Sequence, residues 1–238
     1  MWPFTRHYSI EASAFPEGAV DYHSHILPGV DDGIRKMEDA LAVLEYYGRL
    51  GVKELWLTPH IMEDIPNTTA ALRKRFADLK AAYRGRVKLH LAAENMLDHL
   101  FDERLEADDL LTMDLSPGSP VLLVETSYFN PPLGMKDLLD SIMKKGMRPL
   151  LAHPERYVYM EWADYGRLKA RGVLLQLNLA SLTGLYGKTA AKTARRLLSE
   201  GMYDYYGSDL HRLEPFARAM REKVFTRKEI DALMKLKD

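Results

Sequence analysis

The sequence predicts an α/β protein built around a parallel sheet or barrel. The main observation is a recurring order in which a stretch with helical spacing ends in glycine and a short apolar stretch follows at once. It appears at "GRLGVKELWLTPH", "KKGMRPLLAH", "ARGVLLQLN" and "SEGMYDYYGSD". Short apolar runs are typical of strands buried on both faces of a parallel sheet. Their alternation with helices favours βα units.

The strands are expected at regular intervals along the chain. We expect about seven of them, starting near residues 20, 53, 87, 120, 148, 173 and 203. Glycine ends many helices at the C′ position, because it adopts the left-handed backbone conformation without strain. The glycines predicted at such positions are Gly51, Gly146, Gly172 and Gly201.

Apolar faces with helical spacing mark the helices between these strands. The faces consist of Leu72, Phe76, Leu79 and Tyr83; of Leu138, Leu139, Ile142 and Met143; and of Ala190, Ala194, Leu197 and Leu198. The letters "TRKE" at residues 226–229 match a capping box, which is a typical helix start. They predict a final helix that carries Ile230, Leu233 and Leu236.

The composition excludes several classes of protein. The 238 residues are 47% hydrophobic and 28% charged, as in ordinary globular proteins, and the formal net charge is −1. That charge argues against a nucleic-acid binder that acts through bulk positive charge. The chain contains no cysteine, so disulfides, thiolate metal sites and cysteine nucleophiles are excluded.

The chain shows no linker, so we expect a short N-terminal extension, residues 1–17, and one domain, residues 18–238. The extension carries Trp2, Phe4 and Phe15. The apolar runs are too short to cross a membrane, and the first residues lack the apolar core of a signal peptide. We therefore expect a cytoplasmic protein without membrane insertion. The sequence leaves a homo-oligomer open.

Each predicted strand ends in polar groups that can bind a metal ion or a polar ligand. In chain order these groups are His23 with His25, His60, Glu94, Glu125, His153, Asn178, and Asp209 with His211. In α/β barrels the carboxyl ends of the strands face a common pocket, where active sites are built. These strand ends would gather most of the eight histidines in one place.

The spacing of these residues predicts which way their side chains point, and their types predict which metal ions they bind. Residues i and i+2 of a strand point to the same side, so His23 and His25 are predicted to point inward together, as are Asp209 and His211. Imidazole and carboxylate together suit Mn²⁺, Fe²⁺ and Zn²⁺. The groups exceed the capacity of one ion, so two or three ions with shared carboxylates are expected. Clustered ions lower the pKa of a bridging water to about 7.

Each motif has an ordinary structural explanation when taken alone. An H-x-H pair is often a surface or structural pair, and Asp31 and Asp32 before Gly33 are typical of a turn. The metal site is favoured because all the predicted strands end in polar groups and most histidines take part. The other histidines are not expected to be ligands; they are His7, His90 and His99.

The order and spacing of these motifs resemble the PHP (polymerase and histidinol phosphatase) superfamily. The matching segments are "DYHSHILPGVDDG", "TPH", "AAE", "LVE", "AHPERY", "QLN" and "SDLH". Within the superfamily the chain is most similar to the bacterial capsule-type protein-tyrosine phosphatases. The resemblance implies a distorted (β/α)₇, TIM-like barrel with three divalent metal ions. Manganese is the first expectation, with iron, zinc and magnesium as alternatives.

The resemblance also implies roles for individual residues. One ion would be held by His23, His25, Glu94 and Asp209. Glu94 would bridge to a second ion that also meets His153 and Glu125. A third ion would be held by Asp32, His60 and His211. Arg156 matches the arginine that binds the substrate phosphate, a task that suits its planar fork of donors.

The implied reaction is hydrolysis of a phosphomonoester by direct attack of a metal-bound hydroxide, without a phospho-enzyme. His60 or His211 would supply a proton to the leaving oxygen. The expected substrate is phosphotyrosine in a protein or peptide. The first candidate is the tyrosine-rich tail of a bacterial tyrosine autokinase that controls capsule or exopolysaccharide assembly.

Other functions share such a metal site. The alternatives are a small-molecule phosphatase, such as one that acts on histidinol phosphate, a PHP phosphodiesterase, and a scaffold that binds phosphotyrosine without turnover. The near-neutral charge disfavours the phosphodiesterase, because tracking along nucleic acid favours a basic groove. Relatives often carry basic residues after the histidine of the second strand. Here residues 61–69 are "IMEDIPNTT", so the peptide preference is expected to differ.

Overall fold

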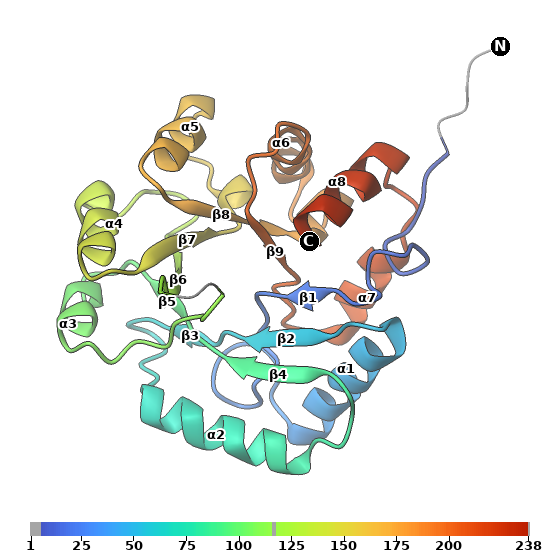
Figure 1. The fold of residues 1–238 in the computed structure, drawn as a ribbon, viewed down its shortest axis with the longest axis horizontal. Helices are drawn as coiled ribbons and strands as arrows, with labels where there is room; N and C mark the ends of the chain where they lie inside the picture. Colours follow the sequence, from blue (N-terminus) through green and yellow to red (C-terminus); the bar gives the residue numbers. More distant parts are fainter. Residues whose placement is uncertain (1–5, 116–117, 238) are drawn as a thin grey trace.

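The computed structural model describes residues 6–115 and 118–237. Its strands form a curled parallel sheet with helices packed around the outside (Figure 1). The strands are β1 (Val20–Asp21), β2 (Glu54–Leu57), β3 (His60–Ile61), β4 (Lys88–Leu91), β5 (Glu94–Met96), β6 (Val121–Glu125), β7 (Arg148–Ala152), β8 (Leu174–Asn178) and β9 (Tyr205–Gly207). The pairs between these strands are all parallel.

Two strand positions are interrupted, which explains why the structure contains more strands than the sequence predicts. β2 and β3 are separated by Thr58 and Pro59, and β4 and β5 by Ala92 and Ala93. Pro59 has no N–H to give to a ladder, so regular pairing breaks there. The backbone bonds nevertheless continue across the gap, since the amide of Glu94 donates to the carbonyl of Pro59 at 3.1 Å. Each interrupted pair therefore occupies one position of the barrel.

The barrel closes between its first and last strand positions. The segments after β1 and β9 form a parallel bridge between Ser24 and Leu210. The amide of Asp209 donates to the carbonyl of His23 at 2.8 Å, and the amide of His25 donates to the carbonyl of Leu210 at 3.1 Å. The prediction of a distorted α/β barrel is confirmed.

The helices fill the connections between the strands (Figure 1). They are α1 (Met37–Leu50), α2 (Thr69–Ala82), α3 (Phe101–Glu106), α4 (Met135–Lys144), α5 (Trp162–Ala170), α6 (Lys188–Ser199), α7 (Leu213–Arg221) and α8 (Arg227–Lys237), with the short 3₁₀ helices η1 (Pro154–Arg156) and η2 (Leu179–Thr183). The four glycines predicted to follow helices all have positive φ, from 66° to 90°. This part of the prediction is confirmed.

The apolar side chains form two layers. The larger layer lies between the strands and the helices and includes Leu79, Ile142 and Leu197 from the predicted helix faces. A smaller cluster contains Trp56, Ala92, Met113, Val121, Leu123, Leu150, Ala152 and Leu174. Successive strand residues point to opposite faces, so Glu125 follows Val121 and Leu123 on the side of the smaller cluster. An apolar layer thus underlies the polar strand ends.

Part of the predicted N-terminal extension packs against the barrel. Tyr8 pairs with Phe225 in an antiparallel bridge, and Ile10 and Phe15 are buried. Trp2 and Phe4 lie outside the described residues. The division of the chain into an extension and one domain remains a prediction. The described helices include none that is long and apolar enough to cross a membrane.

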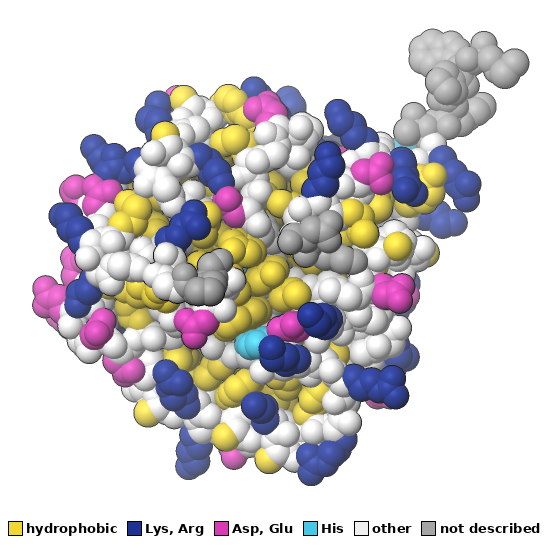
Figure 2. Space-filling model, in the orientation of Figure 1, with side chains coloured by type: hydrophobic (Ala, Val, Ile, Leu, Met, Phe, Trp, Pro, Cys, Tyr) yellow, Lys and Arg dark blue, Asp and Glu magenta, His cyan; other side chains and the backbone are white. Residues whose placement is uncertain are grey.

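The surface carries both signs of charge. On the face in Figure 2, Lys and Arg side chains lie among Asp and Glu side chains around the margin, and hydrophobic side chains gather toward the middle. This mixture agrees with the formal net charge of −1. The face shown therefore has no continuous basic stripe of the kind that tracks a nucleic-acid backbone.

Candidate metal centre

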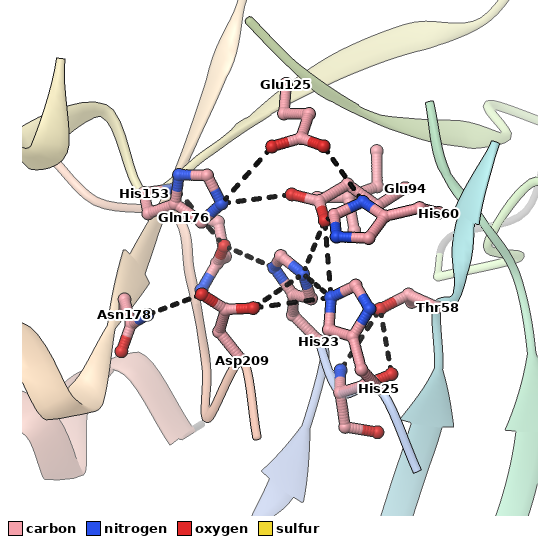
Figure 3. A network of polar contacts seen from close by, with 12 residues as sticks. His23, His25, Thr58, His60, Glu94, Glu125, His153, Gln176, Asn178 and Asp209 are labelled. Carbon is pink, nitrogen blue, oxygen red and sulfur yellow. Dashed lines mark hydrogen bonds and ion pairs between the residues drawn. The ribbon is translucent and has the colours of Figure 1, made fainter. Parts of the chain in front are cut away.

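Two buried histidines, His23 and His25, open the site directly after β1. Their Nε2 atoms are 3.0 Å apart. The Nδ1 atom of His23 contacts Oε1 of Gln176 at 3.0 Å, and the Nδ1 atom of His25 contacts Oδ2 of Asp31 at 2.8 Å. These partners fix the plane of each ring and leave both Nε2 atoms directed into the cluster (Figure 3).

Glu94 lies at the centre of the cluster. The strand register places it beside His60, and its side chain is fully buried. Its Oε2 atom is 3.1 Å from Nε2 of His23, 3.3 Å from Nε2 of His25 and 3.1 Å from Nδ1 of His60. Its Oε1 atom is 3.0 Å from Nε2 of His153. One carboxylate thus meets four imidazoles, as a bridging ligand between ions does.

The other predicted ligands surround this centre. Oδ1 of Asp209 is 3.5 Å from Nε2 of His23, and Oε1 of Glu125 is 2.9 Å from Nδ1 of His60. Oδ1 of Asp32 is 3.3 Å from Nε2 of His211. The structure therefore brings together all nine predicted ligands, which are His23, His25, Asp32, His60, Glu94, Glu125, His153, Asp209 and His211.

The nine residues fall into three groups whose ligand atoms lie within 4.8 Å of one another. The groups are His23, Glu94, His153 and Asp209; His25, Asp32, His60 and His211; and His60, Glu94 and Glu125. This partition places His25 with the third expected ion rather than the first. Which residue binds which ion remains a prediction.

The charges of the site are strongly coupled. Burial opposes ionisation of Asp209, but the imidazoles of His23, His25 and His153 hold its pKa far below the usual range. Burial also opposes protonation of His23, but Glu94 and Asp209 raise its pKa to about 9. Buried carboxylates that raise the pKa of their neighbours create a potential that attracts cations.

Several buried atoms lack a hydrogen-bond partner among the described residues. They include Nδ1 of His60, Oε2 of Glu94 and Oε1 of Glu125. An unpaired buried polar group costs about 1–3 kcal/mol. These atoms approach one another closely without hydrogen-bond geometry, and divalent cations between them would satisfy their lone pairs. The nitrogen and oxygen donors, with no sulfur, suit Mn²⁺, Fe²⁺ and Zn²⁺. The residues present therefore fit a metal centre.

Arg156 lies beside this cluster and is held on three sides. Its Nη1 atom donates to Oδ2 of Asp209 at 2.7 Å. Its guanidinium carbon lies 4.4 Å from the ring centre of Tyr128 and 4.0 Å from that of Tyr186. The planar cation is thus stacked between two aromatic rings, an arrangement that favours arginine over lysine.

Arg156, His60 and His211 line a pocket of about 420 Å³ together with Tyr128 and Tyr186. A larger groove of about 730 Å³ lies between α6 and α8, and none of the nine predicted ligands lines it. We therefore place the chemistry in the smaller pocket.

The histidines that were not expected to be ligands lie outside the three groups. His90 contacts Oε2 of Glu54 at 2.8 Å and stacks on Trp56. His99 forms an exposed pair with Glu63, and His7 is exposed.

Sequence reasoning missed the residues that support the ligands. The sequence predicts a turn at Asp31, yet Asp31 orients His25 and also accepts from the amide of His60 at 3.2 Å. The sequence assigns no role to Gln176, although it lies in the "QLN" segment, and none to Tyr186. The available signal for Gln176 was its position two residues before Asn178 on a predicted strand, which places both on the same face.

A parallel barrel with clustered imidazoles and carboxylates at the carboxyl ends of its strands defines a class of metal-site barrel hydrolases. Residues 19–231 match the family model "Capsular polysaccharide synthesis, CpsB/CapC". The chain belongs to this family.

Two curated relatives of the chain are named tyrosine-protein phosphatases. The chain is 26% identical over 201 residues to the tyrosine-protein phosphatase YwqE of Bacillus subtilis, covering 82% of this chain and 78% of that protein. It is 27% identical over 214 residues to the tyrosine-protein phosphatase CpsB of Streptococcus pneumoniae, covering 82% and 84%.

Solved structures share the fold. One comes from a study of YwqE from Bacillus subtilis and CpsB from Streptococcus pneumoniae, described as unique metal-dependent tyrosine phosphatases. It superposes with a TM-score of 0.76 at 23% identity, over 91% of this chain and 86% of that chain. A zinc-bound amidohydrolase from Burkholderia ambifaria superposes with a TM-score of 0.53 at 13% identity, over 99% and 88%.

Proposed function

We propose that this protein is a metal-dependent protein-tyrosine phosphatase of capsule or exopolysaccharide synthesis. The observation that carries the proposal is the position of Arg156, whose guanidinium contacts Asp209 and faces the pocket that the candidate metal ligands line. An anion-binding fork beside a cluster that attracts cations suits a phosphoryl group. Membership of the CpsB/CapC family and relatives named tyrosine-protein phosphatases support the same function.

The nine clustered residues would hold the metal ions. We propose three ions, manganese in the first place, because the residues form three groups, of which the third shares Glu94 with the first and His60 with the second. When bound, divalent ions supply positive charge for the phosphoryl oxygens and lower the pKa of water. The apolar layer beneath the strand ends excludes bulk water from the buried side of the site, which strengthens the electrostatic contacts of the buried ligands.

Arg156 would bind the phosphate. One of its N–H groups is engaged by Asp209, and an arginine has five. The two stacked tyrosines restrict the guanidinium plane, so the remaining donors can meet equatorial phosphoryl oxygens with little loss of entropy. The same rings, Tyr128 and Tyr186, give the pocket walls that an aromatic leaving group can pack against.

Departure of the tyrosine oxygen needs modest help, since a phenol has a pKa of about 10. His60 and His211 both line the pocket and could hold a proton at that oxygen. The reaction breaks the bond between phosphorus and the phenolic oxygen, consumes one water and releases tyrosine and inorganic phosphate. A thiolate phospho-enzyme is excluded, because the chain has no cysteine.

We propose the tyrosine-rich tail of a bacterial tyrosine autokinase as the protein substrate, met in the cytoplasm. The family description, which names capsular polysaccharide synthesis, supports this choice.

The proposal is tested with protein stripped by a chelator and reloaded separately with Mn²⁺, Fe²⁺, Zn²⁺ or Mg²⁺. Phosphate release is measured from a phosphotyrosine peptide, the same peptide with phosphoserine, histidinol phosphate and bis-p-nitrophenyl phosphate. We expect turnover of the phosphotyrosine peptide only in reloaded protein. Preferred turnover of histidinol phosphate or of the diester, or tight peptide binding without phosphate release, would contradict the proposal.

Variants distinguish the candidate metal ligands from a histidine that lies outside the cluster. His25→Ala and Asp209→Asn should each abolish turnover and lower the number of ions bound per chain, measured by elemental analysis. His90→Ala is the matched control, because His90 is a partly buried, carboxylate-paired histidine outside the three groups. It should leave turnover and metal content unchanged.

A further inference from the structure

The large hydrophobic side chains that are exposed in the described part of the chain all lie in three loops. They are Phe129, Leu133, Val158 and Leu185, with exposures of 70%, 98%, 68% and 48%. The loops follow β6, β7 and β8, so all four residues lie at the end of the barrel that carries the metal centre. We call these four residues the apolar rim.

Three members of the apolar rim adjoin the tyrosines that stack on Arg156. Phe129 directly follows Tyr128, and Leu185 directly precedes Tyr186. The amide of Val158 donates to the carbonyl of Tyr128 at 2.9 Å, which ties the loop after β7 to the loop after β6. Leu185 itself lines the pocket that contains Arg156. The rim therefore continues outward from the pocket walls.

The stretches of these loops that carry the apolar rim contain no charged side chain. Residues 126–134, 157–160 and 179–187 contain no Asp, Glu, Lys or Arg. The loop after β3, at the same end of the barrel, instead carries Glu63 and Asp64. The loop after β7 also holds Arg156, which we assign to the phosphate itself. Acidic side chains beside the phosphotyrosine would therefore find no cationic partner on the rim stretches and would meet repulsion at the acidic loop. An uncharged, apolar segment suits this surface better.

Single exposed hydrophobic residues are common and need no explanation, but their concentration beside a pocket marks a binding surface. Functional loops at the carboxyl ends of barrel strands contact the substrate. A protein substrate has to cross this surface when its phosphotyrosine ring enters the pocket.

We propose that the apolar rim binds apolar side chains that flank the phosphotyrosine of a protein substrate. The enzyme then selects phosphotyrosine in an apolar sequence over phosphotyrosine between acidic residues. This inference rests on the proposed phosphatase function and adds the sequence context of the substrate.

The test compares the metal-loaded wild type with the double variant Phe129→Ser/Leu133→Ser, whose changed side chains are exposed and leave the barrel intact. Asn130→Ser, a change of an exposed polar residue in the same loop, is the matched control. The substrates are free phosphotyrosine and two peptides that differ only in having leucine and valine, or aspartate and glutamate, around phosphotyrosine.

We expect the wild type to prefer the apolar peptide. The double variant should lose about tenfold in kcat/KM on that peptide, the effect of losing roughly one buried apolar side chain. Its kcat/KM on free phosphotyrosine should match that of the wild type and of Asn130→Ser.

Four outcomes would overturn the inference. Equal wild-type rates on the two peptides would refute the proposed role of the rim and leave the phosphatase function intact. An equal loss on all substrates in the double variant would do the same. Absence of phosphotyrosine hydrolysis by the wild type would refute the phosphatase function and the inference with it. Binding to phosphatidylglycerol vesicles that the double variant abolishes, without a peptide preference, would assign the rim to a membrane surface instead.

Discussion

His153 and Asp209 hold backbone conformations that side chains other than glycine rarely adopt, with φ of 33° and 50°. Such conformations cost about 1–3 kcal/mol each and persist where the surroundings enforce them. Asp209 is fixed by bonds from Arg156 and Asn178, and the amide of His153 donates to Gln176 at 3.3 Å. The turns place these ligands where a regular strand would not.

Filling the centre with metal should stabilise the fold, because buried ligand atoms that lack partners then gain them. At one hundred times the dissociation constant, each filled site is expected to contribute about 2.7 kcal/mol. For a chain of this size the melting temperature should rise by roughly 5–10 °C per site. Calorimetry of chelated protein with and without Mn²⁺ checks this, and an unchanged melting temperature with all four candidate metals would contradict it.

Replacing Arg156 should slow the reaction even when the charge is kept. Arg156→Ala removes a charge-assisted contact and is expected to lose about 2–4 kcal/mol of transition-state stabilisation. Arg156→Lys loses the fork and the stacking between Tyr128 and Tyr186, so kcat/KM should fall substantially. Steady-state kinetics on a phosphotyrosine peptide measure both. Arg171→Lys, in another arginine–aspartate pair, is the control, and wild-type kinetics in either Arg156 variant would remove its role.

The sequence revealed candidate ligands but not their supports. His23 and Glu94 could be singled out because each follows an apolar strand, and strand ends of a barrel converge. Asp31 and Gln176 contact the Nδ1 atoms of His25 and His23, which point away from the cluster. Such contacts depend on the folded structure, and local sequence patterns do not predict them. Tyr186 was missed because its contact with Arg156 joins two different βα loops.

At the scale of elements, strand starts were predictable to within one or two residues, as for β6 and β9. The apolar runs that follow helix-ending glycines leave little choice of register. The interruption at Thr58–Pro59 has a signal in the sequence, because Pro59 cannot donate to a ladder. The interruption at Ala92–Ala93 has none, because alanine is as apolar as the neighbouring strand residues.

The start of α8 is fixed by the predicted capping box. The amide of Glu229 donates to Oγ1 of Thr226 at 3.3 Å, and the amide of Thr226 donates to Oε2 of Glu229 at 2.7 Å. Thr226→Ala should reduce the free energy of unfolding by about 1 kcal/mol without changing kcat. Urea unfolding measures this. The control is Thr189→Ala, which changes an exposed threonine of α6. An equal loss of unfolding free energy in this control would show that the capping box does not stabilise α8.

At the scale of the whole molecule, Asp21 links the first strand of the barrel to the segment that follows the last strand. Its buried carboxylate accepts from the amides of His23 and Ser208 at 3.1 and 2.9 Å and from the hydroxyl of Tyr47 at 2.7 Å. The link between Asp21 and Ser208 spans 187 positions. The alternation of strands and helices predicts a barrel, but this closure depends on distant pairs that local spacing does not show.

Asp21→Ala should therefore destabilise the whole fold, because it leaves buried donors unpaired at about 1–3 kcal/mol each. Asp21→Asn can keep one oxygen toward the two amides and should cost less. Urea unfolding of both variants measures the difference. Equal stabilities of Asp21→Ala and wild type would show that closure does not depend on this carboxylate.

The candidate ligands extend from His23 to His211, and the last of them follow β9. A nascent chain still on the ribosome, with β9 unmade, has neither Asp209 nor His211 and lacks Leu210, whose bridge to Ser24 closes the barrel. The growing polypeptide therefore cannot complete the metal centre until the ribosome has passed His211.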